Sequence, residues 1–173
     1  DISEKYNLIS EFYFMTSHHS SFDGDYDIGS LWIRKLLKKI HNRGHKIGLH
    51  PSYNSYLDAK QIQQEYKKLL NVLDSGNIQQ EKYGGRQHYL NWRPSTWQYW
   101  DDAGLSYDST VCFADYAGCR CGVCYEYPVF NVEARAALSL YERPLIVMEC
   151  SLRGYMQLKE EEVFKKILEL NQV

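Results

Sequence analysis

The 173-residue sequence lacks the features that mark several large classes of protein. No apolar run approaches the roughly 20 residues that a membrane-spanning helix needs, and no signal-peptide pattern occurs. The 20 basic and 22 acidic residues nearly cancel, to a formal net charge of -2, so charge gives no reason to expect nucleic acid or an anionic membrane as a partner. The ordinary apolar fraction argues against a disordered chain.

Motifs of several enzyme classes are absent as well. The chain contains no G-x-S-x-G element of a serine hydrolase and no glycine-rich phosphate loop. No internal repeat or low-complexity linker divides it. Its length suits one well-buried domain and is too short for two of typical size, so we expect a single domain over residues 1–173.

Hydrophobic periodicity predicts four main helices and at least four strands. Helices are expected over residues 30–42, 58–73, 94–103 and 160–170. Strands are expected over residues 9–15, 47–49, 105–111 and 145–148, with a short strand or strand end within 84–89. Strands that alternate with helices predict an α/β fold with a parallel sheet.

The segment R-G-H-K-I-G-L-H-P-S-Y-N, from Arg43 to Asn54, is the most informative in the chain. Gly44 is placed to end a helix as a C-cap, and the next apolar residues can cross a sheet. His50 then follows the strand at its carboxyl end, where α/β proteins gather their chemistry. We therefore interpret His50 as a functional histidine and Asn54, four residues later, as a second ligand or hydrogen-bonding group.

This segment, GHKIGLHPSYN, resembles the GHEIGNHTxxH signature of the NodB-homology polysaccharide deacetylases, carbohydrate esterase family 4. Both histidines of that signature bind a divalent metal, usually zinc. The resemblance implies that His50 is the first metal ligand and that Asn54 occupies the second ligand position. An amide oxygen is a weaker zinc ligand than imidazole, so this departure predicts a lower zinc affinity.

The segment RQHY resembles the third motif of the family, RxPY. The resemblance implies that Arg86 orients a catalytic aspartate and that the backbone at Tyr89 helps to bind an oxyanion. His88 stands where the motif has proline. Three roles are open for it: a substitute metal ligand, a general acid or a surface histidine. Asp108 matches an aspartate that tunes the arginine, which predicts a charge-assisted pair between Arg86 and Asp108. A strand-end or turn role for Asp108 is the alternative.

The segments RQHYLNW, PSTW, AGLSYDST and GCRCGVCYEYPVFN together resemble a divergent bacterial branch of the superfamily. That branch has an upstream HDVD motif, which supplies the aspartates for base catalysis and metal binding and does not occur in this sequence. We therefore expect a fragment that lacks its first strand and its C-terminal end, and that is inactive by itself. No histidine follows His88 to match the fifth motif. The fold implied is a distorted (β/α) barrel, incomplete here.

The function implied by the resemblance is a metal-dependent deacetylase that removes N-acetyl groups from a bacterial polysaccharide or glycan precursor. Its partner would be that N-acetylated glycan. The alternative is a catalytically inactive carbohydrate-binding or scaffold descendant, favoured by Asn54 and by the absent late histidine. The resemblance leaves the compartment open between the cytoplasm and the cell envelope, and it leaves the oligomeric state open.

The cysteines allow a further interpretation. Cys119, Cys121 and Cys124 form C-x-C-x-x-C, which is compatible with a structural zinc site, a disulfide or free loop thiols. The odd total of five argues against a complete disulfide framework. A cysteine-anchored zinc module for protein interaction is thus a second alternative function. For the other histidines we expect a solvated loop at residues 18–19 and a structural hydrogen bond at His45.

Overall fold

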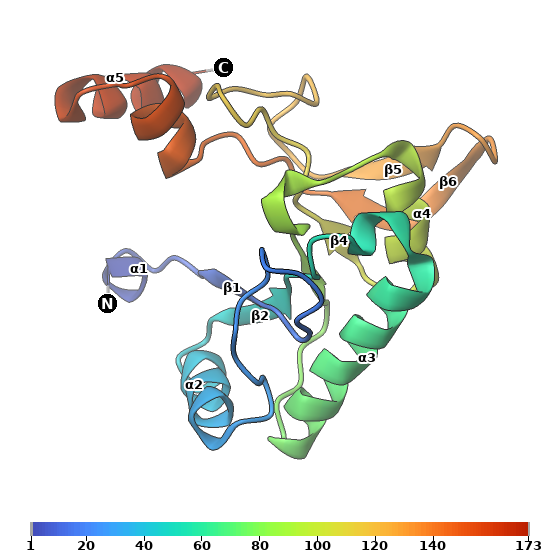
Figure 1. The fold of residues 1–173 in the computed structure, drawn as a ribbon. Helices are drawn as coiled ribbons and strands as arrows, with labels where there is room; N and C mark the ends of the chain where they lie inside the picture. Colours follow the sequence, from blue (N-terminus) through green and yellow to red (C-terminus); the bar gives the residue numbers. More distant parts are fainter. Residues whose placement is uncertain (1, 173) are drawn as a thin grey trace.

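The structure is a computed structural model that describes residues 2–172 (Figure 1). The α-helices in this range are α1 (Ile2–Lys5), α2 (Leu31–Asn42), α3 (Ala59–Ser75), α4 (Pro94–Asp102) and α5 (Glu160–Leu170). The strands are β1 (Glu11–Phe14), β2 (Lys46–Leu49), β3 (Gly84–Gly85), β4 (Tyr107–Asp108), β5 (Tyr127–Asn131) and β6 (Ala136–Glu142). Short helical turns are η1 (Ser55–Leu57), η2 (His88–Leu90) and η3 (Ser151–Tyr155).

The strands form one six-stranded sheet in the order β1-β2-β3-β4-β6-β5. Neighbouring strands from β1 to β6 in this order are parallel, and only β5 is antiparallel, paired with β6. The predicted α/β class and parallel sheet are therefore confirmed for most of the sheet. The short β3 and β4 are the central strands, so the loops that follow them leave from the middle of one sheet edge.

The four main helices lie where the hydrophobic period predicts them, with every boundary within two residues. Ser30 caps α2 by accepting a hydrogen bond from the Ile33 N–H, and Asp58 caps α3 by accepting from its first backbone N–H groups. Gly44 and Gly104 follow the ends of α2 and α4 with φ of 80° and 85°. This left-handed backbone suits glycine, which explains why both helices end there.

The core lies between the sheet and the helices α2, α3 and α4. Strand residues such as Ile47 and Leu49 are fully buried, as are Leu37 of α2, Leu69 of α3 and Trp100 of α4, within about 1% of complete burial. All belong to one apolar cluster. Alternate residues of β2 face this cluster, and the others face the opposite side of the sheet.

The sheet is strongly curved. Glu11 begins β1 and Arg143 directly follows β6, with three strands between them. Four inter-strand steps would separate them by roughly 19 Å in a flat sheet, yet Arg143 forms an ion pair with Glu11. The Arg143 guanidinium also lies 3.8 Å from the centre of the Tyr107 ring, and the Tyr13 hydroxyl donates to Glu11 at 2.6 Å. These side chains therefore share the concave face.

The prediction of a buried strand over residues 145–148 is wrong. These residues are half-buried and form no strand, and the strand that pairs with β4 is instead β6. Pro144, which lacks a backbone N–H, directly precedes the apolar run and disfavours its entry into a central position of the sheet. Strand β6 was missed because alanine, serine and glutamate have low β propensity.

Helix α5 has an amphipathic sequence, but none of its residues is buried. In Figure 1 it lies apart from the sheet and from the helices that cover it. Within residues 2–172 no helix combines the length and the apolar character that crossing a bilayer requires.

We predict that Gly85→Ala disrupts the sheet. A Cβ atom at this position would lie 1.8 Å from the Leu49 carbonyl oxygen, so β2 and β3 could not pair as they do. The unfolding free energy is expected to fall by about 4 kcal/mol or more, measured by urea denaturation. Gly154→Ala is the matched control, because a Cβ there meets nothing within 4 Å. Equal stability of the two variants would contradict the prediction.

Candidate functional site

His50 and Arg86 lie side by side because they follow neighbouring parallel strands. Leu49, the last residue of β2, is in register with Gly85, the last residue of β3. The Arg86 backbone N–H donates to the Leu49 carbonyl oxygen at 3.0 Å, which continues the ladder beyond the strand ends. His88 follows two residues later, at the start of η2. Three of the residues singled out in the sequence therefore meet at the carboxyl edge of the sheet, as α/β topology leads one to expect.

Two imidazole rings face each other at this edge. The Nδ1 atom of His50 lies 2.6 Å from the Arg86 carbonyl oxygen, and the Nε2 atom of His88 lies 2.8 Å from the Phe22 carbonyl oxygen. A carbonyl oxygen only accepts, so both of these nitrogens carry protons. The other two nitrogens, Nε2 of His50 and Nδ1 of His88, are 3.0 Å apart. In this tautomer the lone pairs of two neutral rings would face each other, and a cation bound there would relieve their repulsion.

His50 favours the neutral form. Burial is the main cause, and it lowers the pKa of His50 to about 4, with smaller contributions in the same direction from nearby His88 and Arg86. The hydrogen bond to the Arg86 carbonyl acts in the opposite direction. At neutral pH the Nε2 atom of His50 therefore offers a lone pair, as a metal ligand must.

Buried polar side chains fix the loop that follows β2. Glu65 of α3 is 1% exposed and accepts hydrogen bonds from the Ser52 N–H at 2.9 Å and the Ser52 hydroxyl at 2.5 Å. Gln87 is fully buried, and its side-chain amide donates to the Ser55 hydroxyl at 2.5 Å. Both serines are thus held inward, which fixes the path of the chain between His50 and η1.

Glu65 and Gln87 are not among the site residues predicted from the sequence. A signal existed for Glu65, because it lies between Ile62 and Leu69 on the buried side of the predicted helix 58–73. A carboxylate on the apolar side of a helix needs hydrogen-bond donors to offset the free-energy cost of its burial. No comparable signal marks Gln87, whose burial follows from the packing of η2 against the loop.

Asn54, the predicted second metal ligand, lies directly before η1. It is exposed, and it begins η1 without a side-chain capping bond. Among the predicted residues, the structure places His88 beside His50 instead.

Arg86 was expected to form an ion pair with Asp108, and the structure does not form it. The Arg86 Nε and Nη2 atoms donate to the Ser109 carbonyl oxygen at 2.8 Å and to the Ser109 hydroxyl at 2.9 Å. Ser109 directly follows β4, and its carbonyl oxygen and hydroxyl group take up the guanidinium. The guanidinium also lies 5.4 Å from the centre of the Tyr13 ring.

Asp108 forms a buried carboxyl pair with Glu142. The two residues are in register on β4 and β6, and both are 0% exposed. Glu142 accepts hydrogen bonds from the Val111 N–H at 3.0 Å and from the Trp97 indole at 3.1 Å. Thr110 donates to Asp108 Oδ1, while Asp108 Oδ2 is buried without a hydrogen-bond partner. Burial raises the pKa of both carboxyl groups, and the Asp108 charge raises that of Glu142 further.

Tyr89 and Leu90 adopt an unusual backbone conformation. Both have φ of 55°, a left-handed conformation that costs a residue other than glycine about 1–2 kcal/mol. Tyr89 is 63% exposed, and the centre of its ring lies 4.7 Å from that of His88 at 90°. Such strain is concentrated at functional sites. The backbone that was expected to help bind an oxyanion is therefore strained, and the Tyr89 side chain faces outward.

A cavity of about 320 Å³ opens beside His50. Its walls come from the ends of several strands and from η3, namely His50, Arg86, Gln87, Tyr89, Leu90, Ala114, Met148, Cys150 and Tyr155. The lining is mostly apolar, with the imidazole and the guanidinium as the main polar groups. Small-molecule sites commonly have this composition.

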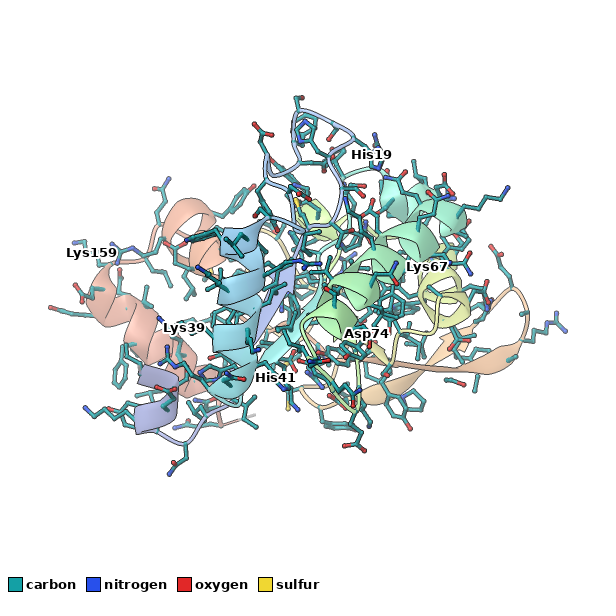
Figure 2. The ribbon with its side chains drawn as sticks, turned by 90° about the horizontal axis from the view of Figure 1, so that it is seen from below. His19, Lys39, His41, Lys67, Asp74 and Lys159 are labelled. Carbon is teal, nitrogen blue, oxygen red and sulfur yellow. The ribbon has the colours of Figure 1, made fainter. Side chains whose placement is uncertain are left out.

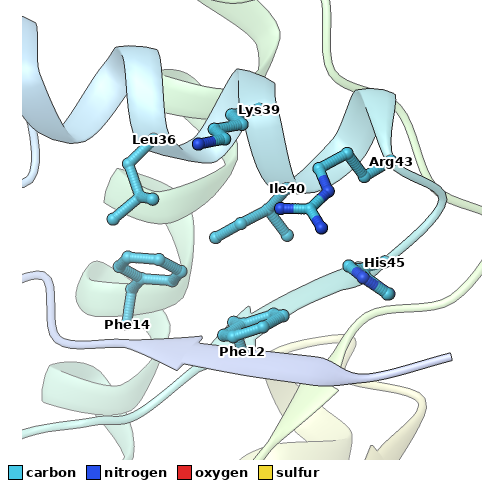
Figure 3. A pocket seen from close by; sticks show the side chains of 7 residues that line it. All are labelled: Phe12, Phe14, Leu36, Lys39, Ile40, Arg43 and His45. Atoms are coloured by element: carbon cyan, nitrogen blue, oxygen red, sulfur yellow. The ribbon is translucent and has the colours of Figure 1, made fainter. Parts of the chain in front are cut away.

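A second cavity, of about 290 Å³, lies between α2 and β1 (Figure 3). Phe12 and Phe14 point from β1 toward the helix, and Lys39 and Arg43 lie at its rim. None of the residues predicted for the site lines this cavity. The chemistry-bearing groups are therefore gathered at the carboxyl edge of the sheet.

The remaining histidines and the cysteines lie elsewhere. His45 is buried and accepts a hydrogen bond from the Ser10 N–H at 3.3 Å, which confirms its structural role. His19 lies in an exposed loop, and His41 lies on α2 at the opposite end of the molecule (Figure 2). All five cysteines are free. Across residues 2–172 no set of three or more histidine, cysteine or acidic side chains is arranged to hold a metal ion.

Comparison with known proteins identifies no relative: no protein-family model matches the chain, and no curated protein matches it.

We predict that Asp108→Asn reduces the loss of stability at alkaline pH. The raised pKa of a buried carboxyl group means that its favourable contribution is complete below the ordinary value and is lost as pH rises through the raised one. Asparagine keeps the acceptor for Thr110 and places an amide donor near Glu142. Between about pH 7 and pH 9 the variant should gain about 1–2 kcal/mol relative to the wild type.

Urea denaturation at both pH values measures this difference. Asp74→Asn is the control, because Asp74 is exposed on α3 (Figure 2). If Asp108→Asn loses as much stability between the two pH values as the wild type does, the proposed sharing of a buried site by two carboxyl groups is incorrect.

Proposed function

We propose that this chain provides two ligands of a divalent-metal site in a deacetylase-like hydrolase, which removes N-acetyl groups from a bacterial polysaccharide or glycan precursor. One observation carries the proposal: the Nε2 atom of His50 and the Nδ1 atom of His88 face each other at 3.0 Å, while the other nitrogen of each ring is bonded to a backbone carbonyl. Metal-bound histidines commonly have a carbonyl bond on the second nitrogen.

The two nitrogens have a spacing close to that of zinc ligands. Zn–N bonds of about 2.0–2.1 Å at a tetrahedral angle place two ligand nitrogens roughly 3.4 Å apart. The observed 3.0 Å requires only a small outward movement of one ring. Two neutral imidazoles also suit zinc better than the amide oxygen of Asn54. We therefore assign the second ligand to His88 and not to Asn54.

The residues described here do not complete a site, since no third histidine, cysteine or acidic side chain joins the pair within residues 2–172. The proposal therefore requires at least one carboxylate from a segment or chain outside this range. The resemblance supplies a candidate in the aspartates of the HDVD motif. A bound zinc ion would supply a Lewis acid and lower the pKa of a water molecule.

The other residues have roles that their own geometry supports. Arg86 is held by Ser109, so its position is fixed and its charge is available to orient an acidic group, as the resemblance implies. The cavity beside His50 has apolar walls at Leu90, Ala114 and Met148 that suit a small acyl group. An acyl group held there would lie next to the His50 imidazole.

The curvature of the sheet supports the finer fold that the resemblance implies, a distorted (β/α) barrel. Helices α2, α3 and α4 cover one side of the sheet, and the concave side contains Glu11 and Arg143. Parallel strands that curve in this way, with helices outside, are the elements from which such a barrel is built.

A catalytically inactive carbohydrate-binding protein is the second candidate function. The exposed position of Asn54 favours it, and so does the lack of a third ligand beside the two imidazoles within residues 2–172. Metal binding separates the two candidates, because a binding protein has no need for an ion between His50 and His88.

We predict that Zn²⁺ binds between the two rings. In a titration followed by NMR of the imidazole protons, the signals of His50 and His88 should change together. His50→Ala and His88→Ala should each lower the zinc affinity by about two orders of magnitude, since each removes one of two nitrogen ligands.

Two control variants test the assignment. His41→Ala removes a distant histidine, and Asn54→Ala removes the ligand that the sequence alone predicts, and neither should change the affinity. If Asn54→Ala weakens binding and His88→Ala does not, the ligand assignment is wrong. If zinc perturbs neither ring, the chain has no metal site at this edge and the inactive alternative is favoured.

A further inference from the structure

Three aromatic side chains from separate parts of the chain form a continuous rim beside His88. Phe22 comes from the loop after β1, Tyr53 from the loop after β2, and Tyr89 from η2. The ring centres are 4.6 Å apart for Phe22 and Tyr53, 5.3 Å for Tyr53 and Tyr89, and 5.7 Å for Phe22 and Tyr89. We call this set the aromatic rim.

Two rings of the aromatic rim are exposed, and the third, Tyr53, is half-buried. Phe22 is 53% and Tyr89 is 63% accessible to solvent, although large apolar side chains contribute most to stability when they are buried. The left-handed backbone of Tyr89 directs its ring outward at an energetic cost. A contiguous exposed set of this kind commonly marks a binding surface.

The aromatic rim is also held rigidly. Asp23 Oδ1 accepts a hydrogen bond from the Tyr53 N–H at 2.7 Å, and Asp23 Oδ2 accepts from the His19 and Ser20 N–H groups at 2.9 and 2.8 Å. Asp23 therefore ties the loop that carries Phe22 to the loop that carries Tyr53. A surface fixed in advance loses little conformational entropy when a ligand binds.

The contacts of Asp23 also affect the charge of the surface. Burial opposes ionisation of its carboxyl group, but the backbone bonds from Tyr53, His19 and Ser20 together lower its pKa below the ordinary value. The resulting negative charge is directed at backbone N–H groups beneath the rings. The rim itself therefore presents uncharged π-faces and tyrosine hydroxyl groups.

This chemistry matches a neutral sugar ring. A pyranose has an apolar face of C–H groups and an edge of hydroxyl groups, and tyrosine combines an apolar face with a hydroxyl in the same way. We propose that Phe22, Tyr53 and Tyr89 form a saccharide-binding subsite, which stacks a pyranose ring next to the His50–His88 pair. The inference rests on the proposed function for the class of glycan, but binding and reaction can be tested separately.

The test is a calorimetric titration of the chain with chitopentaose and with cellopentaose, in the presence of a chelator so that no metal contributes. Tyr89→Gly removes the ring and also relieves the left-handed backbone, whereas Tyr89→Phe keeps the ring. We expect Tyr89→Gly and Phe22→Ala to raise the Kd by about tenfold and Tyr89→Phe to change it by less than about twofold. The thermal stability of Tyr89→Gly should not be lower than that of the wild type.

Phe130→Ala is the matched control, because Phe130 on β5 is also 53% exposed but does not belong to the aromatic rim. It should leave both Kd values unchanged. The subsite is overturned if the wild type binds neither oligosaccharide, if Tyr89→Gly and Phe22→Ala bind as tightly as the wild type, or if Phe130→Ala weakens binding equally.

Acetate release from chitopentaose separates the two proposals, when it is measured with zinc-loaded protein that includes the carboxylate ligand required by the proposed function. If oligosaccharide binding depends on Tyr89 but no acetate is released, the subsite is supported and the proposed reaction is contradicted. If acetate is released and the KM of Tyr89→Gly and of Phe22→Ala equals that of the wild type, the reaction is supported and the subsite is contradicted.

Discussion

The close contact between β2 and β3 at Leu49 and Gly85 is the constraint on which the candidate site depends. The two backbones approach so closely that only glycine fits at position 85, where a Cβ atom would meet the Leu49 carbonyl oxygen. Gly48 is similarly restricted, by the Gly84 carbonyl oxygen at 2.4 Å from a Cβ atom. This contact fixes the register of two short strands. Because Leu49 pairs with Gly85, the residues that follow them, His50 and Arg86, lie side by side.

The backbone also determines the chemistry of the two imidazoles. The proton on each ring is positioned by a carbonyl group, of Arg86 for His50 and of Phe22 for His88. A carbonyl group is present whatever side chain a residue has, so substitutions at Arg86 or Phe22 leave the acceptor in place. The tautomers are therefore protected against change in the side chains around them, while the surfaces beyond the rings, such as the cavity and the aromatic rim, are free to vary.

The sequence predicts the parts of the fold that depend on local periodicity. The apolar stripes of α2 and α3 and the helix end at Gly44 depend on residues within a few positions of their own. The position of His50 after a strand follows from the same local pattern.

The features that the sequence did not predict depend on contacts between residues that are far apart in the sequence. The apolar run at 145–148 has strand character by itself, but β6 occupies the place beside β4. Asn54 matches a ligand position by its spacing alone, and its side chain is exposed. Arg86 was expected to pair with Asp108, but its guanidinium bonds to Ser109 after β4, and Asp108 is buried beside Glu142. Each outcome depends on residues distant in the sequence, which no local pattern contains.

The ion pair between Glu11 and Arg143 joins residues 132 positions apart. Contacts of such separation are slow to form, because a long loop must close before they stabilise the chain. Helices such as α2 and α3 depend on neighbouring residues and can form much earlier. The concave shape of the sheet is therefore completed late in folding, and a chain still under synthesis on the ribosome cannot acquire it until Arg143 has emerged.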